Sequence, residues 1–161
     1  MAIAILIVAT GTGAEEASNR AESPVFSLGP AAEWTVRGAS ASKAGMAGAL
    51  EITPIRDWLE IEFGGSILAN SGHTELSADV VFKKPFRLSE STEFMIGVGP
   101  SIMKTTSGPD RGIERAAELD LDFMFWPQEK IGWYVQPTWS VVPKSGNQSV
   151  GVSVGLLLRI L

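Results

Sequence analysis

Carboxylates at alternate positions are the side chains of this sequence with the clearest chemical potential. In one run, Glu118, Asp120 and Asp122 alternate with Leu119 and Leu121. A β-strand directs successive side chains to opposite faces, so the three carboxylates are predicted to share one face of a strand. Buried carboxylates repel one another and lose hydration, and they therefore require cations nearby.

The same alternation in other segments predicts a charged interior built from several strands. Arg37 and Arg159 have inward parity on the first and last strand-like segments, which become neighbours if the sheet closes. Because Arg forms bidentate, permanently charged pairs, we expect both guanidinium groups to neutralise inward carboxylates. The predicted lumen charge network comprises Glu33, Arg37, Glu51, Glu60, Glu62, Glu75, Asp79, Glu118, Asp120, Asp122 and Arg159.

Two interpretations of this network are open. It could be a structural array that plugs the lumen and fixes strand register, or a path that conducts cations or protons along the carboxylates. An eight-stranded barrel leaves little room for water, which favours the structural interpretation. Acids outnumber bases on this face, so some carboxylates should be protonated, hydrated or close to a rim.

Other kinds of chemistry have weaker support. His73 lies in a predicted turn without an oriented nucleophile, and Asp110 lies in a polar loop with too few ligands for calcium. The sequence has no Cys, which excludes a thiolate nucleophile and a Cys-ligated metal. A formal net charge of -5 argues against nucleic-acid binding. We therefore predict no catalytic residue, no cofactor and no metal, and we do not expect an enzyme.

The elements that must position the carboxylates are short strands closed by turn chemistry. Eight strand-like segments follow Pro24, separated by clusters of Gly, Pro, Asn and Ser. Their predicted bounds are Phe26–Arg37, Ala44–Thr53, Trp58–Leu68, Thr74–Phe82, Glu93–Met103, Ile113–Trp126, Ile131–Val142 and Ser149–Ile160. The fourth segment is predicted to end at a turn formed by Lys83, Lys84 and Pro85. Evenly spaced hairpins without a helix predict an all-β, eight-stranded antiparallel up-and-down barrel, since closure removes exposed sheet edges.

The first 23 residues differ from the rest. Residues 1–14 combine an aliphatic run with small residues, which is typical of a signal peptide, although the usual basic start is missing. Residues 15–23 form a polar linker, and residues 24–161 form the predicted barrel domain. A buried N-terminal strand or helix is the alternative for the aliphatic run.

The composition of the two faces predicts which one meets lipid. The apolar face is nearly unbroken, whereas the acidic face is rich in Gly and Ser, which fit a tight interior. All six Lys residues fall at predicted turns or strand ends, where a membrane interface tolerates them. Aromatic residues near predicted strand ends are candidates for an interfacial girdle: Trp58, Phe82, Trp126 and Trp133. The fold class is therefore a transmembrane β-barrel, with the lipid bilayer as partner.

The end of the chain adds a local feature. Ser153, Gly155, Leu158 and Ile160 follow the order polar, Gly, apolar, apolar, although the last positions are aliphatic and Leu161 adds one residue. Over residues 24–161 the chain resembles the small eight-stranded outer-membrane barrels of Gram-negative bacteria, the class of the OmpA transmembrane domain and OmpX. That resemblance implies an outer-membrane location and a terminal-strand signal read by the outer-membrane assembly machinery.

The predicted function is a structural, porin-like outer-membrane barrel with a charged, largely plugged lumen and a minor surface-interaction role. We expect a monomer. The alternatives are a soluble periplasmic lipocalin-like carrier of an apolar ligand and a narrow cation channel. A lipocalin-like barrel would place its apolar residues inside and its polar residues outside, the reverse of a membrane barrel.

Overall fold

The computed structural model describes residues 23–38, 41–106 and 112–160. These residues form eight strands: β1 (Val25–Arg37), β2 (Ser42–Ile55), β3 (Leu59–Asn70), β4 (His73–Arg87), β5 (Thr92–Thr105), β6 (Gly112–Phe125), β7 (Ile131–Val142) and β8 (Asn147–Arg159). The predicted signal peptide and Asp110 lie outside the described residues, as does nearly all of the predicted linker. None of the residues described belongs to a helix with the length and hydropathy of a membrane span.

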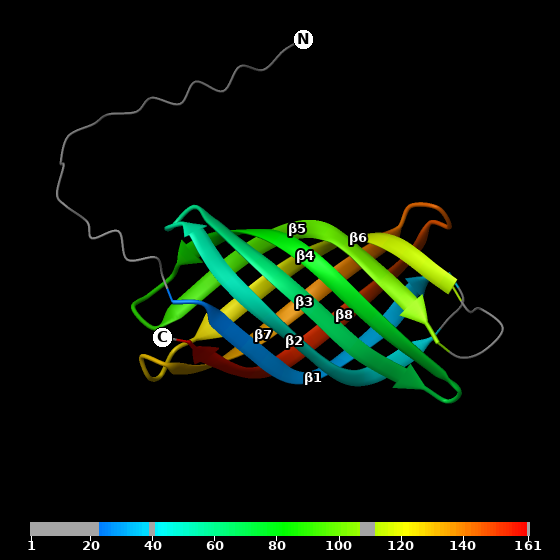
Figure 1. The fold of residues 1–161 in the computed structure, drawn as a ribbon, viewed down its shortest axis with the longest axis horizontal. Coiled ribbons are helices and arrows are strands. Elements are labelled where there is room, and N and C mark those ends of the chain that lie inside the picture. The colour runs from blue at the N-terminus through cyan, green and yellow to red at the C-terminus, as the bar shows by residue number, and fades with distance from the viewer. Residues whose placement is uncertain (1–22, 39–40, 107–111, 161) are drawn as a thin grey trace, which may run out of the picture.

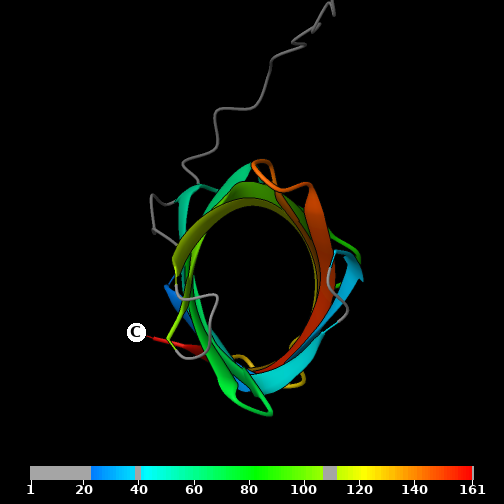
Figure 2. The same ribbon diagram turned by 90° about the vertical axis from the view of Figure 1, so that its right-hand side faces the viewer.

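The strands form one closed antiparallel barrel in which each strand pairs with the next along the chain. β1 also pairs with β8, and Val25 lies opposite Arg159 in that register. Figure 2 shows the resulting closed ring seen from one end. The predicted fold class and antiparallel order are therefore confirmed. The start of β1 and the end of β8 lie at one end of the barrel, here called the terminal end (Figure 1).

Burial alternates from residue to residue along each strand, because every second side chain points into the barrel. On β6, Asp120 and Asp122 are buried while Leu121 and Phe123 lie on the outer face and are partly exposed. The other strands repeat this arrangement, with large apolar side chains exposed on the outside, among them Phe63, Ile67, Val98 and Leu156. The alternation predicted for the sixth segment is confirmed, and polar side chains face the lumen.

The two connections described in full at the end opposite to the termini, here called the loop end, are tight turns. Asn70 pairs with His73, so Ser71 and Gly72 form a two-residue hairpin loop, and Gly72 has a φ of 106°. Between β7 and β8, the Gly146 amide donates to the Val142 carbonyl at 2.8 Å. Glycine at such positions adopts the positive φ that other residues rarely adopt.

The predicted turn after the fourth segment is wrong. β4 continues through Lys83, Lys84 and Pro85 to Arg87, and the chain reverses only at residues 88–91. Pro85 remains in register with Met95 on β5. Two lysines and a proline are typical of a turn, but here the regular pairing with β5 keeps them in a strand. Because β4 continues past Phe82, it brings the positively charged side chain of Lys83 into the lumen.

Candidate functional site

The centre of the lumen is a lysine surrounded by three carboxylates. Lys83 Nζ lies 2.9 Å from Glu51 Oε1, 2.5 Å from Glu62 Oε2 and 2.7 Å from Asp122 Oδ2. All three contacts are ion pairs, and those with Glu51 and Glu62 are also hydrogen bonds that Lys83 donates. The side chains of this group are 0–5 % exposed. We call these four residues the Lys83 cluster.

Two features of the sheet place Lys83 in the lumen. Because β4 does not end at Phe82, the alternation that buries Val81 also turns Lys83 inward. On the neighbouring strand β5, Gly97 lies opposite Lys83, and a Cβ at Gly97 would lie 2.6 Å from Lys83 Cγ. The absence of a side chain at Gly97 therefore makes room for the lysine stem. The expectation that all lysines lie at turns or strand ends is wrong for Lys83.

A second lysine bridges carboxylates nearer the loop end. Lys43 on β2 donates a hydrogen bond of 2.6 Å to Glu75 on β4, and its Nζ lies 3.6 Å from Glu33 Oε1 on β1. These three side chains are 19 %, 12 % and 19 % exposed, far more than the Lys83 cluster. The Lys43 bridge therefore touches solvent, whereas the Lys83 cluster is sealed.

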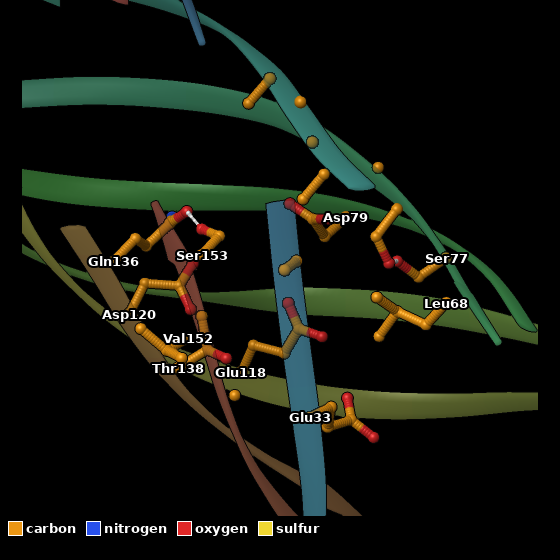
Figure 3. Close-up of a pocket in the computed structure, with 18 of the residues that line it drawn as sticks. Glu33, Leu68, Ser77, Asp79, Glu118, Asp120, Gln136, Thr138, Val152 and Ser153 are labelled. Carbon is orange, nitrogen blue, oxygen red and sulfur yellow. Dashed lines mark hydrogen bonds between the residues drawn. The ribbon is translucent and has the colours of Figure 1, made fainter. Parts of the chain in front are cut away.

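A small chamber shares side chains with both ion-pair groups. Its volume is about 90 Å³, and its wall includes Glu33 and Glu75 of the Lys43 bridge and Glu62 of the Lys83 cluster. Figure 3 shows Asp79, Glu118 and Asp120 in this wall beside polar uncharged residues.

Part of the chamber wall is held by hydrogen bonds. Gln136 Nε2 donates to Glu62 Oε1 at 3.2 Å, and the Ser153 hydroxyl donates to Gln136 Oε1 at 3.0 Å. These bonds link the wall to the Lys83 cluster. Among the described residues, Asp120 Oδ1 has no hydrogen-bond partner.

An apolar layer closes the barrel at the terminal end. It consists of Met95, Met124, Trp126, Tyr134 and Leu157, with Val25 packed against it. Its residues come from near the starts of β1, β5 and β7 and near the end of β8, and from the end of β6 together with Trp126 just after it, so it fills the terminal end of the lumen. Tyr134 belongs both to this layer and to the chamber wall.

The two arginines expected to neutralise the lumen lie elsewhere. Arg159 places its guanidinium 4.2 Å from the centre of the Trp126 ring and donates to the Glu129 carbonyl at 3.0 Å. Arg37 is exposed at the loop end of β1, where a register irregularity between Thr35 and Arg37 disturbs the pairing with β8. Such an irregularity changes the face to which a side chain points, and the alternation pattern of the sequence does not show where an irregularity occurs. The cations found among the carboxylates are Lys83 and Lys43.

The carboxylates predicted to face the lumen do occur there, with Glu60 described separately below. Glu33, Glu51, Glu62, Glu75, Asp79, Glu118, Asp120 and Asp122 all occur in the two ion-pair groups or the chamber wall. Glu60 is half-buried and lies opposite Lys83 in the β3–β4 register. The odd or even position of each acid along its strand was enough to predict that it faces inward, because the alternation of side chains depends only on strand geometry.

Solved structures with the same architecture are numerous at low sequence identity. Neisserial surface protein A (NspA) superposes with a TM-score of 0.70 at 11 % identity, covering 84 % of this chain and 97 % of that chain. Ail, the attachment invasion locus protein of Yersinia pestis, has a TM-score of 0.61 at 14 % identity, with 86 % and 99 % covered. The N-terminal β-barrel domain of Pseudomonas aeruginosa OprF has a TM-score of 0.61 at 10 % identity, with 86 % and 100 % covered.

The fold is that of the small eight-stranded outer-membrane barrels. At these identities the likeness concerns the fold alone. Neither the family models nor the curated proteins gave a match to this sequence.

The predicted aromatic girdle of this barrel separates into two groups. Trp58, Phe82 and Trp133 are exposed on the outside, and Trp133 stacks on Phe125 with ring centres 4.0 Å apart. Phe82 lies within β4 rather than beside a turn, because that strand is longer than predicted. An interfacial role for these three residues stays a prediction.

Trp126 is not on the outside. It is buried in the apolar layer, and its indole Nε1 donates to Glu93 Oε2 at 3.2 Å. The inward alternation of Asp120, Asp122 and Met124 continues one step past the end of β6, which places Trp126 in the lumen. The position of Trp126 next to a turn indicated an interfacial girdle, whereas the alternation of side chains along β6 correctly indicates that Trp126 faces inward.

The residues of the predicted terminal-strand signal have clear structural positions. Ser153 points into the lumen, while Leu158 and Ile160 are exposed on the outside. A Cβ at Gly155 would lie 2.2 Å from the Leu28 carbonyl oxygen and 2.8 Å from Gly29 Cα, both on β1. Gly155 therefore has a packing role at the β1–β8 closure. Recognition by assembly machinery stays a prediction.

Proposed function

We propose that this protein is a structural outer-membrane barrel whose lumen is closed by the Lys83 cluster and the apolar layer. The observation that carries the proposal is the distribution of side chains across the wall. Large apolar residues are exposed on the outside, and charged residues fill the inside. In lipid that outer surface is buried, and closure of the sheet leaves no unpaired strand edge.

The length of the strands supports a membrane crossing. The described strands contain 12 to 15 residues, which exceeds the roughly 9–11 residues that a tilted transmembrane strand requires. Outer-membrane location is further supported by the fold shared with NspA, Ail and OprF. A non-enzymatic role accords with the same comparisons.

The side-chain distribution argues against an apolar-ligand carrier. A carrier needs an apolar cavity, but carboxylates such as Asp79, Glu118 and Asp120 stand in the chamber wall among its apolar residues Leu68, Met103 and Val152. A cation channel needs a continuous path, and the sealed Lys83 cluster lies beside the apolar layer at the terminal end. These features favour the closed structural barrel over both alternatives.

A surface role is the secondary part of the proposal. The Yersinia pestis neighbour is named an attachment invasion locus protein, which describes that protein alone. In this chain, the two loop-end connections described in full span only residues 71–72 and 143–146. Connections this short offer a modest contact surface, so we place structure first and surface interaction second.

Reconstitution tests the proposal directly. The urea-unfolded chain should gain β-structure on dilution into phospholipid vesicles, as measured by circular dichroism, and should stay unstructured without lipid or detergent. The folded barrel should then give no steady single-channel conductance in a planar bilayer. A monodisperse folded monomer in detergent-free buffer would overturn the membrane assignment, and steady cation-selective conductance would overturn the closed lumen.

A further inference from the structure

Four charged residues meet at the terminal end of the barrel. Arg56 and Asp57 lie in the turn between β2 and β3, whereas Lys84 and Arg87 lie near the end of β4. Arg56 Nε lies 3.9 Å from Asp57 Oδ2, and Arg87 Nη2 lies 3.4 Å from Asp57 Oδ1. Lys84 donates a hydrogen bond to the Asp57 carbonyl oxygen. We call these four residues the Asp57 cluster, in which three cations surround one carboxylate.

Lys84 brings a positive charge that the Asp57 cluster does not neutralise. Among the described residues Lys84 forms no ion pair, and its hydrogen bond goes to an uncharged backbone carbonyl. The one carboxylate is already shared by the two guanidinium groups. Arg87 makes that contact through a single nitrogen and is 53 % exposed, although a guanidinium group has five N–H donors that match a phosphate bidentately. Lys84 and Arg87 are therefore both able to donate to an anion from outside the chain.

The surface around Lys84 is apolar and aromatic. Lys84 faces outward on β4 between the exposed rings of Phe82 and Phe86, and its Nζ lies 5.9 Å from the centre of the Phe86 ring. The Phe86 ring centre is 6.0 Å from that of Phe94 on β5, which is 5.0 Å from that of Phe123 on β6. Aromatic rings near the ends of membrane barrel strands mark the level of the headgroups. Lys84 therefore lies beside this row of rings, close to the level at which acyl chains give way to headgroups.

These surroundings indicate which anion fits. A lysine on a lipid-facing surface is costly unless its ammonium group reaches the polar interface. At that level a membrane supplies phosphate groups, and Lys and Arg bind phosphate through charge-assisted hydrogen bonds. A phospholipid would also cover the exposed rings of Phe86 and Trp58 with its acyl chains, which a soluble anion cannot do.

The charge of the whole chain cannot supply such a preference. Its formal net charge is -5, so the protein as a whole does not attract anions. Any preference for an anionic lipid must therefore come from a local group of cations such as the Asp57 cluster.

We propose that Lys84 and Arg87, assisted by Arg56, bind the phosphate of an anionic phospholipid in the leaflet at the terminal end. The lipid class is one whose headgroup carries a phosphodiester and no cationic group, as in phosphatidylglycerol. This inference rests on the membrane-barrel function proposed above and deepens it by naming a lipid and the residues that hold it.

The test measures which lipid lies next to the Asp57 cluster. A variant of the full chain that retains only Trp58 is folded into vesicles of phosphatidylcholine and phosphatidylglycerol, in which one of the two lipids has brominated acyl chains. Trp58 is the reporter, because it follows Asp57 directly and is exposed on the outside. From the quenching we expect phosphatidylglycerol to be enriched about fivefold or more over its share of the vesicle, since one Lys or Arg near a membrane surface contributes about that factor.

Matched variants assign the enrichment to the Asp57 cluster. Lys84→Met should lower it about fivefold, and Arg87→Met should change it in the same direction. Lys84→Arg keeps the cation and should keep the enrichment. Lys130→Met removes an equal charge from an exposed turn at the same end and should leave the enrichment unchanged.

A second measurement needs no tryptophan substitution. Phosphatidylglycerol should raise the urea concentration at which the unmodified chain unfolds from vesicles, because a ligand that binds only the folded state stabilises it. The gain should be smaller in Lys84→Met and undiminished in Lys130→Met. Soluble glycerol phosphate should neither reproduce the gain nor reverse the quenching, since it has no acyl chains.

Three results would overturn the inference. They are equal quenching by the two brominated lipids, an equal loss of enrichment in Lys130→Met and Lys84→Met, and displacement of the lipid by glycerol phosphate, which would assign the anion to solution. Circular dichroism establishes that the barrel is folded before quenching is measured, so each of these results would leave the membrane-barrel function standing. A chain that folds in no vesicle would overturn that function and the lipid site with it.

Discussion

Lys83 Nζ lies 2.9 Å from Glu51 Oε1, although the two residues are 32 positions apart and β3 separates their strands. The contact spans the interior of the barrel. With Glu62 and Asp122 it connects β2, β3, β4 and β6 through one ammonium group. The stability of the closed barrel should therefore depend strongly on this lysine.

Replacing Lys83 with Met should strongly destabilise the barrel. The variant keeps the length of the side chain but leaves three buried carboxylates without their cation, and breaking a buried ion pair in this way costs about 3–5 kcal/mol. Urea unfolding in phospholipid vesicles measures the loss. Lys84→Met is the matched control, because Lys84 is on the outer face and donates to the Asp57 carbonyl at an exposed site.

The cause of that loss can be separated from lost packing. Adding Glu51→Gln and Asp122→Asn to Lys83→Met removes two of the uncompensated charges, so part of the stability should return. If Lys83→Met unfolds at the same urea concentration as Lys84→Met, the Lys83 cluster does not stabilise the fold.

Gly155→Ala should destabilise the β1–β8 closure by about 1–3 kcal/mol, the usual cost of overpacking. The added methyl would collide with the Leu28 carbonyl oxygen, which belongs to backbone and cannot move aside easily. The measurement is urea unfolding of the barrel refolded without assembly machinery. Gly65→Ala is the control, since its Cβ would meet only the Ser77 carbonyl oxygen at 3.1 Å. Equal stability of the two variants would assign Gly155 to signalling rather than to packing.

Arginine on the outer surface should cost free energy in proportion to its depth in the bilayer. Val98 is exposed near the middle of β5, so Val98→Arg should cost about 2–4 kcal/mol of unfolding free energy in vesicles. Ile113 is exposed near the loop end of β6, so Ile113→Arg should cost about 0–1 kcal/mol. Similar costs at the two sites would contradict a lipid-facing belt.

Fluorescence quenching should distinguish Trp126 from Trp133, two residues that the sequence predicts to lie in one interfacial girdle. Variants that retain only Trp133 or only Trp126 are folded into vesicles containing lipids with brominated acyl chains. Emission of Trp133 should fall because its ring is exposed outside, while emission of Trp126 should persist because its ring is buried in the apolar layer. Quenching of Trp126 to the level of Trp133 would show that the apolar layer does not enclose it.

Much of the fold can be predicted from the sequence, because the alternation that defines a strand is a local property of the chain. A period of two along each segment fixes which side chains share a face, so the inward position of Asp120 and Asp122 followed without any tertiary information. Turn chemistry was less dependable, because Lys83, Lys84 and Pro85 look like a turn but pair regularly with β5. Because the fourth segment was predicted to end at Phe82, Lys83 was not expected to be the cation at the centre of the lumen.

The sequence by itself determined the strand order, because evenly spaced turns predict hairpins between consecutive strands. It also determined the acidic inner face and the apolar outer face, because these depend on alternation along single strands. Only the tertiary structure decided which cation meets which acid. Lys83 rather than Arg159 neutralises these carboxylates because register and closure bring the inward side chain of Lys83 on β4 together with those of Glu51 on β2 and Asp122 on β6, while Arg159 ends beside Trp126. Contacts across a barrel depend on the relative positions of all eight strands, which alternation within any one strand does not contain.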